Sequence, residues 1–230
     1  MAERPENQVA LALLERLDGG RLREASAWFA GGTAISLRCG EFRVSRDVDF
    51  LCASNDGYRE LRARVRGEGA RGLFTRDVDL LREPRIDRYG IRLALGLGDV
   101  ALKLEIVSEG RISLSGFDDA ALPVARLTDE DLVAEKLLAN DDRYLDDSAL
   151  GRDAVDLLML ERTLGALPDA AWTKARVAYG ASVDRAWEEA LRRMRARPDL
   201  VARAFDVMGV SAEARDVVRT RLARLPDDEA

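Results

Sequence analysis

Acidic side chains at a two-residue spacing are the first feature of this chain that could do chemistry. Asp47 immediately precedes the segment 48–52, and Asp49 lies within it; the apolar residues of this segment predict a short strand. Because residues i and i+2 of a strand point to the same side, the two carboxylates can share one metal cluster. Glu105 lies on the polar face of a later predicted strand, 99–107. If the two strands are neighbours, three carboxylates converge on one site.

A glycine pair upstream predicts an anion-binding turn. Gly31 and Gly32 interrupt the apolar run 25–30, which we interpret as a buried strand. Thr33 then enters a short helix over 33–39 as its N-cap. Glycines let a backbone approach a triphosphate closely, and the N–H groups at a helix N-terminus favour anions. Three converging carboxylates beside such a turn are what two-metal nucleotidyl transfer needs, because one metal activates the attacking hydroxyl and the other holds the triphosphate.

A near-copy of the acidic motif limits what Asp-x-Asp means by itself. RDVDFL (46–51) recurs as RDVDLL (76–81), without a glycine pair at the matching distance upstream. We therefore interpret Asp77 and Asp79 as solvent-facing strand residues. For Asp47 and Asp49 the glycine turn, the spacing and the apolar continuation all favour a functional site.

Composition restricts the chemistry further. The 230 residues include no histidine, which excludes Ser-His-Asp and Cys-His catalysis, HExxH zinc hydrolysis and HD-type phosphohydrolases. Hard oxygen ligands without imidazole favour magnesium or manganese over zinc. The net charge of −6 argues against a broad surface for nucleic acid. One segment is locally basic and predicts either a solvated helix face or an RNA-binding patch: Arg192, Arg193, Arg195 and Arg197.

The rest of the composition is that of a globular protein without a membrane segment. Its apolar runs are far shorter than the roughly 20 residues that cross a bilayer, and the first residues lack the pattern of a signal peptide. We therefore expect a cytoplasmic protein. Cys39 and Cys52 are too few for a disulfide framework or a structural zinc site, so we expect two small buried hydrophobes.

Hydrophobic periodicity predicts an α/β N-terminal half and a helical remainder. Helices are expected over 7–18, ended by Gly19-Gly20, and over about 55–67, capped by Ser54. Strands are expected at 25–30, 48–52, 77–82, 89–95 and 99–107, the last two joined by a hairpin at 96–99. From Thr128 onward helices through about Asn140 and over 149–164 precede three or four more. We place the domains at 1–125 and 126–230.

The stretch FAGGTAISLRCGEFRVSRDVDFLC (29–52) resembles the opening motif of the AbiEii/AbiGii-toxin-like nucleotidyltransferases, members of the DNA polymerase β-like nucleotidyltransferase superfamily. The resemblance continues in REPRIDRYGIRL (82–93), KLEIVSEGRI (103–112) and AEKLLANDDRYLDDSALGRDAVDLLML (134–160). It implies an α+β fold, with a nucleotidyltransferase-type mixed sheet and flanking helices followed by an all-helical C-terminal region.

The resemblance also implies an activity. Such a protein moves a nucleoside monophosphate from an NTP to an acceptor hydroxyl, of RNA or protein, and releases pyrophosphate. It uses Mg²⁺ (or Mn²⁺), and it is often the toxin of a toxin–antitoxin pair, so a cognate antitoxin is an expected partner. No membrane partner is expected.

The same resemblance assigns roles to individual residues. Asp47, Asp49 and Glu105 would ligate the metals, with Glu105 as the base for the incoming hydroxyl. Many nucleotidyltransferases have Gly-Ser where this chain has Gly-Gly-Thr, and the residues that would contact the triphosphate are Gly31, Gly32 and Thr33. Ser45 matches the family's serine just before the acidic pair.

Later motifs match residues that approach the nucleotide in such toxins. Lys136 would hold a phosphate as a point charge, and the alternative is a surface lysine. Arg152 and Asp153 match the RDxxDL motif, but with Asp156 they also suit a structural ion-pair network. We favour the network for Asp156 and a site-facing role for Asp153, with Arg143 and Tyr144 as further candidates for nucleotide contact.

Two other functions stay open at this stage. One is a non-catalytic binding module, a degenerate transferase fold that works through a partner, because the Gly-Ser element is altered and the third acid is Glu. The other is an aminoglycoside-type nucleotidyltransferase, which shares the metal chemistry and modifies a small molecule. The arginine cluster near the C-terminus favours RNA as the acceptor.

Overall fold

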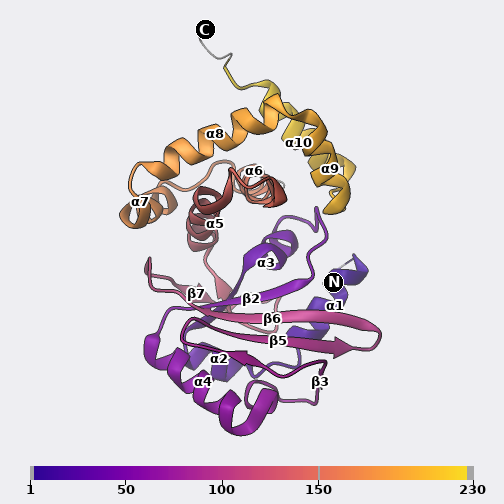
Figure 1. The fold of residues 1–230 in the computed structure, drawn as a ribbon, viewed down its shortest axis with the longest axis vertical. Helices are drawn as coiled ribbons and strands as arrows, with labels where there is room; N and C mark the ends of the chain where they lie inside the picture. Colours follow the sequence, from indigo (N-terminus) through magenta and orange to yellow (C-terminus); the bar gives the residue numbers. More distant parts are fainter. Residues whose placement is uncertain (1–2, 150, 227–230) are drawn as a thin grey trace. The chain divides into compact units, whose positions relative to one another are not determined.

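The computed structural model describes residues 3–149 and 151–226, and its contacts divide the chain into two compact units (Figure 1). Unit 1 comprises Met1–Glu41 and Ser45–Asp129, and unit 2 comprises Phe42–Val44 and Glu130–Ala230. Each unit has its own buried core, so each is described by itself.

A mixed sheet, eight-stranded over the described residues, forms the centre of unit 1 (Figure 1). Its strands are β1 (Ala27–Ala30), β2 (Asp47–Cys52), β3 (Asp79–Leu80), β4 (Arg85–Ile86), β5 (Gly90–Leu97), β6 (Val100–Ser108), β7 (Gly116–Phe117) and β8 (Arg126–Leu127). The order is β3-β5-β6-β2-β1-β8-β7, and β4 pairs with β5. Strand β2 is antiparallel to β1 and parallel to β6, so the acidic motif lies on an interior strand.

Strict alternation decides which face of these strands is buried. In β2, Val48 and Phe50 have no exposed surface, while Asp47 and Asp49 point to the other face. In β6, Leu104 and Ile106 are buried in the same way and Glu105 is on the opposite face, as predicted. Burying apolar surface contributes about 25 cal/mol per Å², so a one-residue slip of either strand would expose its core side chains.

The helices of unit 1 are α1 (Pro5–Leu14), α2 (Gly19–Glu24), α3 (Gly31–Arg38), α4 (Asn55–Glu68) and the 3₁₀ turn η1 (Gly69–Leu73). Helix α4 follows the prediction closely. The Ser54 hydroxyl accepts a hydrogen bond from the Gly57 N–H, which caps the helix. The apolar stripe of α4 is buried as expected: Tyr58, Leu61 and Val65.

Two glycine pairs behave differently from the prediction. Gly19-Gly20 was expected to end the first helix, but α1 ends at Leu14 and the pair begins α2, because Asp18 caps that helix by accepting the Arg21 N–H. Thr33 was expected as an N-cap. Helix α3 instead starts at Gly31 with Ala30 as its cap position, and Thr33 lies inside its first turn.

The remaining differences in unit 1 concern very short strands. The strand expected over 77–82 shrinks to the two residues of β3, and β4, β7 and β8 are not foreseen at all. A strand of two residues shows no alternation, so its pairing depends on distant partners rather than on its own pattern. The β5–β6 hairpin was foreseen: Leu97 pairs with Val100, and Gly98 adopts a φ of 58° in the turn.

Unit 2 is helical, as expected. It contains α5 (Asp129–Arg143), η2 (Asp147–Ala149), α6 (Arg152–Leu164), α7 (Asp169–Tyr179), α8 (Ser182–Ala196), α9 (Pro198–Val207) and α10 (Ala212–Ala223). The predicted core positions of α6 are buried: Val155, Leu158 and Leu160. The segment Phe42–Val44 joins this unit, because the Val44 N–H donates to the Met208 carbonyl and the Phe42 carbonyl accepts from the Ser211 N–H.

The α+β class is confirmed: a mixed sheet with flanking helices precedes a helical region. Cys39 and Cys52 are free thiols, Cys52 buried and Cys39 half-buried. Among the helices of the described residues, none combines the length and apolar character that a membrane crossing requires.

Candidate active site

The glycine turn and the acidic strand meet at one contact in unit 1. Ala30 pairs with Asp49 in the antiparallel register of β1 and β2, and Gly31 follows with a φ of 73°. A Cβ atom on Gly31 would lie 2.3 Å from the Asp49 Oδ2 atom, well inside any allowed contact. Both the backbone conformation and the close approach therefore require glycine here. The two motifs singled out in the sequence form one site.

Thr33 ties helix α3 to the acidic strand. Its side chain is fully buried, and its hydroxyl donates a short hydrogen bond to the Asp47 carbonyl. Helix α3 packs against β2, so its first turn, Gly31 to Thr33, lies beside the acidic pair. Thr33 thus fixes the backbone of Asp47, and its expected contact with a triphosphate stays a prediction.

The third predicted carboxylate is on the neighbouring strand. In the parallel register of β2 and β6, Glu105 pairs with Asp49, and Lys103 pairs with Asp47. Neighbouring strands are about 4.8 Å apart, and register partners point to the same face. Asp47, Asp49 and Glu105 therefore share one face of the sheet.

Two cations hold the Glu105 side chain. The Arg92 Nε atom lies 2.9 Å from Glu105 Oε1, and the Lys103 Nζ atom lies 2.7 Å from Oε2. Arg92 belongs to β5, where it pairs in register with Glu105. Each oxygen of this carboxylate is thus engaged by a positive charge.

The carboxylates of Asp47 and Asp49 fit a hard divalent cation, although no third carboxylate among the residues that the structure describes is close enough to complete a metal cluster. Asp47 and Asp49 present carboxylate oxygens from one face of a strand, which is what Mg²⁺ or Mn²⁺ prefers. Across the described parts of the chain, no three Asp, Glu or Cys side chains are gathered closely enough to hold a metal ion. At this site both Glu105 oxygens are bound by cations, Arg92 and Lys103.

The near-copy of the motif has none of these neighbours. Asp77 and Asp79 are both exposed, as predicted, and β3 pairs with β5 alone at one end of the strand order. Arg71 is the ion-pair partner of Asp77, at 3.7 Å on the surface.

The later motifs form a buried ion-pair network inside unit 2. The Lys136 Nζ atom lies 3.0 Å from an oxygen of Asp153 and 3.0 Å from an oxygen of Asp156. Arg143 donates two hydrogen bonds to Asp153, and Arg43 donates two to Asp156. Lys136 is only 8% exposed, so its interpretation as a surface lysine is wrong.

Charge pairing outweighs burial in this network. Burial would lower the pKa of Lys136, but the charges of Asp153 and Asp156 overcome it and raise that pKa. Burial would likewise raise the pKa of Asp153, but Lys136 and Arg143 hold it well below its usual range. The network predicted for Asp156 is present, and it also includes Asp153.

The other candidates lie at the surface or near it. Arg152 is exposed, whereas Ser45 and Tyr144 are half-buried. Their expected contacts with nucleotide stay predictions.

The basic segment of unit 2 is engaged in local contacts. Arg192 pairs with Glu188 and Glu189, and Arg195 donates to the carbonyls of Leu225 and Pro226. Both Arg193 and Arg197 bind Asp147, and hydrogen bonds from Arg197 and then Arg193 lower the pKa of that carboxyl to about 2. These pairings favour the interpretation as a solvated helix face over an RNA-binding patch.

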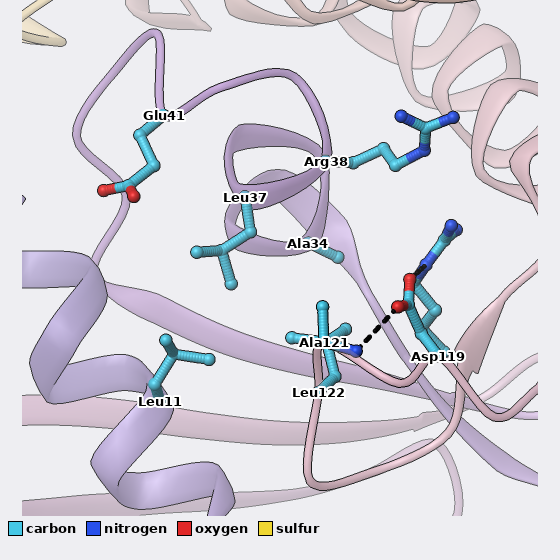
Figure 2. A pocket seen from close by; sticks show the side chains of 9 residues that line it. Leu11, Ala34, Leu37, Arg38, Glu41, Asp119, Ala121 and Leu122 are labelled. Atoms are coloured by element: carbon cyan, nitrogen blue, oxygen red, sulfur yellow. Dashed lines mark hydrogen bonds and ion pairs between the residues drawn. The ribbon is translucent and has the colours of Figure 1, made fainter. Parts of the chain in front are cut away.

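A cavity of about 420 Å³ lies elsewhere in unit 1 (Figure 2). Its wall includes Arg126, which is buried and donates to Asp119 and Asp129, and Arg38, which also binds Asp129. The other lining residues are Leu11, Ala34, Leu37, Glu41, Asp119, Ala121 and Leu122. None of the predicted site residues lines this cavity.

Comparison with solved structures supports the class of fold. A crystal structure of an antigenic nucleotidyltransferase-like protein from Paracoccidioides brasiliensis matches with a TM-score of 0.53 at 14% identity, covering 86% of this chain and 92% of that one. A putative nucleotidyltransferase from H. pylori matches with a TM-score of 0.36 at 14% identity, covering 84% of this chain and 99% of the other. At 14% identity the likeness to the Paracoccidioides brasiliensis protein concerns the fold alone. No curated protein matches the chain.

A family model decides membership. The model described as "Nucleotidyl transferase AbiEii toxin, Type IV TA system" matches residues 13–227. The chain therefore belongs to the AbiEii family, and it is a nucleotidyltransferase of the toxin–antitoxin class. The family resemblance predicted from the sequence is confirmed.

Proposed function

We propose that this chain transfers a nucleoside monophosphate from an NTP to an acceptor hydroxyl, with a divalent metal held by Asp47 and Asp49. The observation that carries the proposal is the contact of Gly31 with the Asp49 carboxylate. It joins a helix N-terminus, which favours phosphate oxygens, to carboxylates that favour a cation.

The residues have distinct roles in this reaction. Amides of the first turn of α3, at Gly31 and Gly32, bind phosphate oxygens, and Thr33 holds the Asp47 backbone in place. The acceptor oxygen bonds to the α-phosphorus, the α–β phosphoanhydride bond breaks, and pyrophosphate leaves with that electron pair. Glu105 takes the proton of the acceptor hydroxyl. A bound Mg²⁺ or Mn²⁺ supplies positive charge that neutralises the triphosphate.

Lys136 and Arg143 are nucleotide contacts that the family resemblance implies. Asp153 holds Lys136 and Arg143 in place, and the network sums to one net positive charge from Arg43, Lys136, Arg143, Asp153 and Asp156. A net positive network suits a phosphate. Arg152 and Ser45 are the further contacts that the family resemblance implies.

To test the proposal, the chain is incubated with each of the four labelled NTPs, with magnesium or manganese, and with total RNA or total protein. We expect transfer of label to one of the two acceptor pools, with release of pyrophosphate. Asp49→Ala abolishes the transfer, and Asp79→Ala, the matched change in the near-copy, preserves it. Failure of the wild-type chain to transfer any label, or full activity of Asp49→Ala, would contradict the proposal.

A second candidate, a catalytically silent member of the family that acts through a partner protein, is favoured by one observation. Within the described residues no three acidic side chains form a metal cluster, and both Glu105 oxygens contact cations. The growth of cells that express the wild-type chain or Asp47→Ala distinguishes the transferase from the catalytically silent protein. If Asp47→Ala relieves growth arrest, the reaction causes the toxicity, and if arrest persists, binding alone causes it.

The toxin–antitoxin class implies an antitoxin partner, and we propose that one is encoded alongside this chain. Co-expression of the neighbouring gene product should restore growth of cells that express the wild-type chain. A small-molecule acceptor, the aminoglycoside-type alternative, would instead show label transfer to the drug and none to RNA or protein.

A further inference from the structure

The two cations on Glu105 differ in how they are anchored. The Arg92 guanidinium also binds Asp87, at 3.0 Å, and Asp87 is itself fixed by the N–H groups of Tyr89 and Gly90. The missing side chain of Gly90 leaves room for the Arg92 guanidinium, because a Cβ atom on Gly90 would lie 3.2 Å from the guanidinium carbon. Arg92 is therefore built into the β4–β5 turn.

Lys103 has no such anchor. Among the described residues Glu105 is its one ion-pair partner, and its side chain is 40% exposed. Lys103 also pairs in register with Asp47, so its ammonium group stands on the face that carries all three predicted metal ligands. A lysine is a flexible, hydrated point charge, which makes it easier to displace than an arginine that bridges two carboxylates.

We infer that Lys103 is a placeholder for the metal: its ammonium group neutralises Glu105 in the metal-free chain, and a divalent cation must displace it to gain this third carboxylate. The inference rests on the proposed function of Asp47 and Asp49. It assigns Arg92 the opposite role, as a positioning residue that keeps Glu105 at the site while Lys103 leaves.

The exchange has a physical consequence. A positive charge on the face that carries Asp47 and Asp49 opposes binding of a divalent ion there, and Glu105 is unavailable while Lys103 holds its Oε2 atom. Displacement of Lys103 lifts both obstacles at once. It also frees the oxygen that the proposed reaction uses to take the proton. Metal affinity is thereby kept low until another anion, such as a triphosphate, attracts the lysine.

Binding of Mn²⁺ to the nucleotide-free full chain, followed by electron paramagnetic resonance, tests this inference. Lys103→Met should bind Mn²⁺ at least about fivefold more tightly than the wild type, because one opposing charge is gone. Lys103→Gln is a second variant in case the first one folds poorly, and thermal unfolding reports on both.

Arg85→Met is the matched control. Arg85 pairs in register with Arg92, so it lies on the same face; it is exposed, and among the described residues it has no ion-pair partner. Its removal takes the same charge from the face without freeing Glu105, and we expect a change of less than about twofold, because exposed charges are screened.

The outcomes separate the inference from the proposed function on which it rests. If Asp49→Ala abolishes Mn²⁺ binding but both Lys103 variants bind as the wild type does, the placeholder role is wrong and the metal site stands. An equal gain in Arg85→Met would also overturn the placeholder role, since a general charge effect would explain it. If Asp49→Ala binds Mn²⁺ as tightly as a wild type that binds it measurably, or if neither the wild type nor the Lys103 variants bind it, the metal site and the placeholder role both fall.

Discussion

Two almost identical peptides of unit 1 have opposite surroundings. RDVDFL (46–51) contributes β2, an interior strand bonded to both β1 and β6, while RDVDLL (76–81) contributes β3, a two-residue strand bonded only to β5. The first aspartate pair faces Gly31, Lys103 and Glu105. The second faces solvent, with Gly96 as the register partner of Asp79.

The difference lies in the neighbours, since five of the six residues are the same. An interior strand receives side chains from both flanking strands, and one of these, β1, leads directly into the glycine turn. An edge strand receives them from one side only. The strands that pair with an Asp-x-Asp segment therefore determine whether its carboxylates form a functional site. The two copies serve as matched controls for each other.

The largest contrast is expected in activity. Asp49→Ala should lower nucleotidyl transfer at least about 100-fold, as removal of a group that stabilises transition-state charge does. Asp79→Ala should leave the rate within about twofold, because its side chain is exposed and far from the site in the strand order. Initial rates with labelled NTP measure both. Equal losses would mean that the second copy is part of the site.

The glycine beside each copy gives the next contrast. Gly31→Ala forces a left-handed residue to carry a Cβ against the Asp49 carboxylate, at a cost of roughly 2–4 kcal/mol of unfolding free energy. In Gly96→Ala the nearest atom to the new Cβ is the end of the flexible Leu81 side chain, 3.2 Å away, and the Asp79 Cβ atom at 3.5 Å is in ordinary contact, so the change should cost less than about 1 kcal/mol. Urea titrations compare the two. A stable, active Gly31→Ala protein would show that the close contact is not needed.

The valines between the aspartates should separate the copies by stability. Val48 is fully buried, so Val48→Ala should cost roughly 2 kcal/mol through lost burial and a cavity. Val78 is half-buried, and Val78→Ala should cost less than about 1 kcal/mol. The midpoint of urea unfolding monitors both. Similar shifts would indicate that the edge copy is packed as firmly as β2.

The smallest contrast concerns two threonines. Thr33→Val leaves the Asp47 carbonyl without its hydroxyl donor, which should cost about 1–2 kcal/mol and reduce activity, because the Thr33 side chain itself is buried. Thr75 precedes the second copy, and its exposed hydroxyl donates to the Arg16 carbonyl at 3.1 Å. Thr75→Val should cost at most about 0.5 kcal/mol, with unchanged activity. If Thr33→Val kept full stability, the hydroxyl would not be what holds Asp47.

The sequence alone gave a sound account of local structure. Alternation placed Asp47 and Asp49 on one face of β2 and Glu105 on the polar face of β6, because a period of two is a property of each strand by itself. The Ser54 cap and the apolar stripe of α4 were equally predictable from local sequence, since a cap and its helix are neighbours in the chain. The absence of histidine limited the chemistry without any structure at all.

The tertiary structure alone decided which of these pieces meet. The parallel pairing of β2 with β6 links residues more than 50 positions apart, and no pattern within either strand encodes it. The same holds for the cations on Glu105 and for the burial of Lys136 between Asp153 and Asp156. Periodicity fixes the face of a strand or helix, whereas packing of distant segments fixes its partners, and the partners distinguish Asp49 from Asp79.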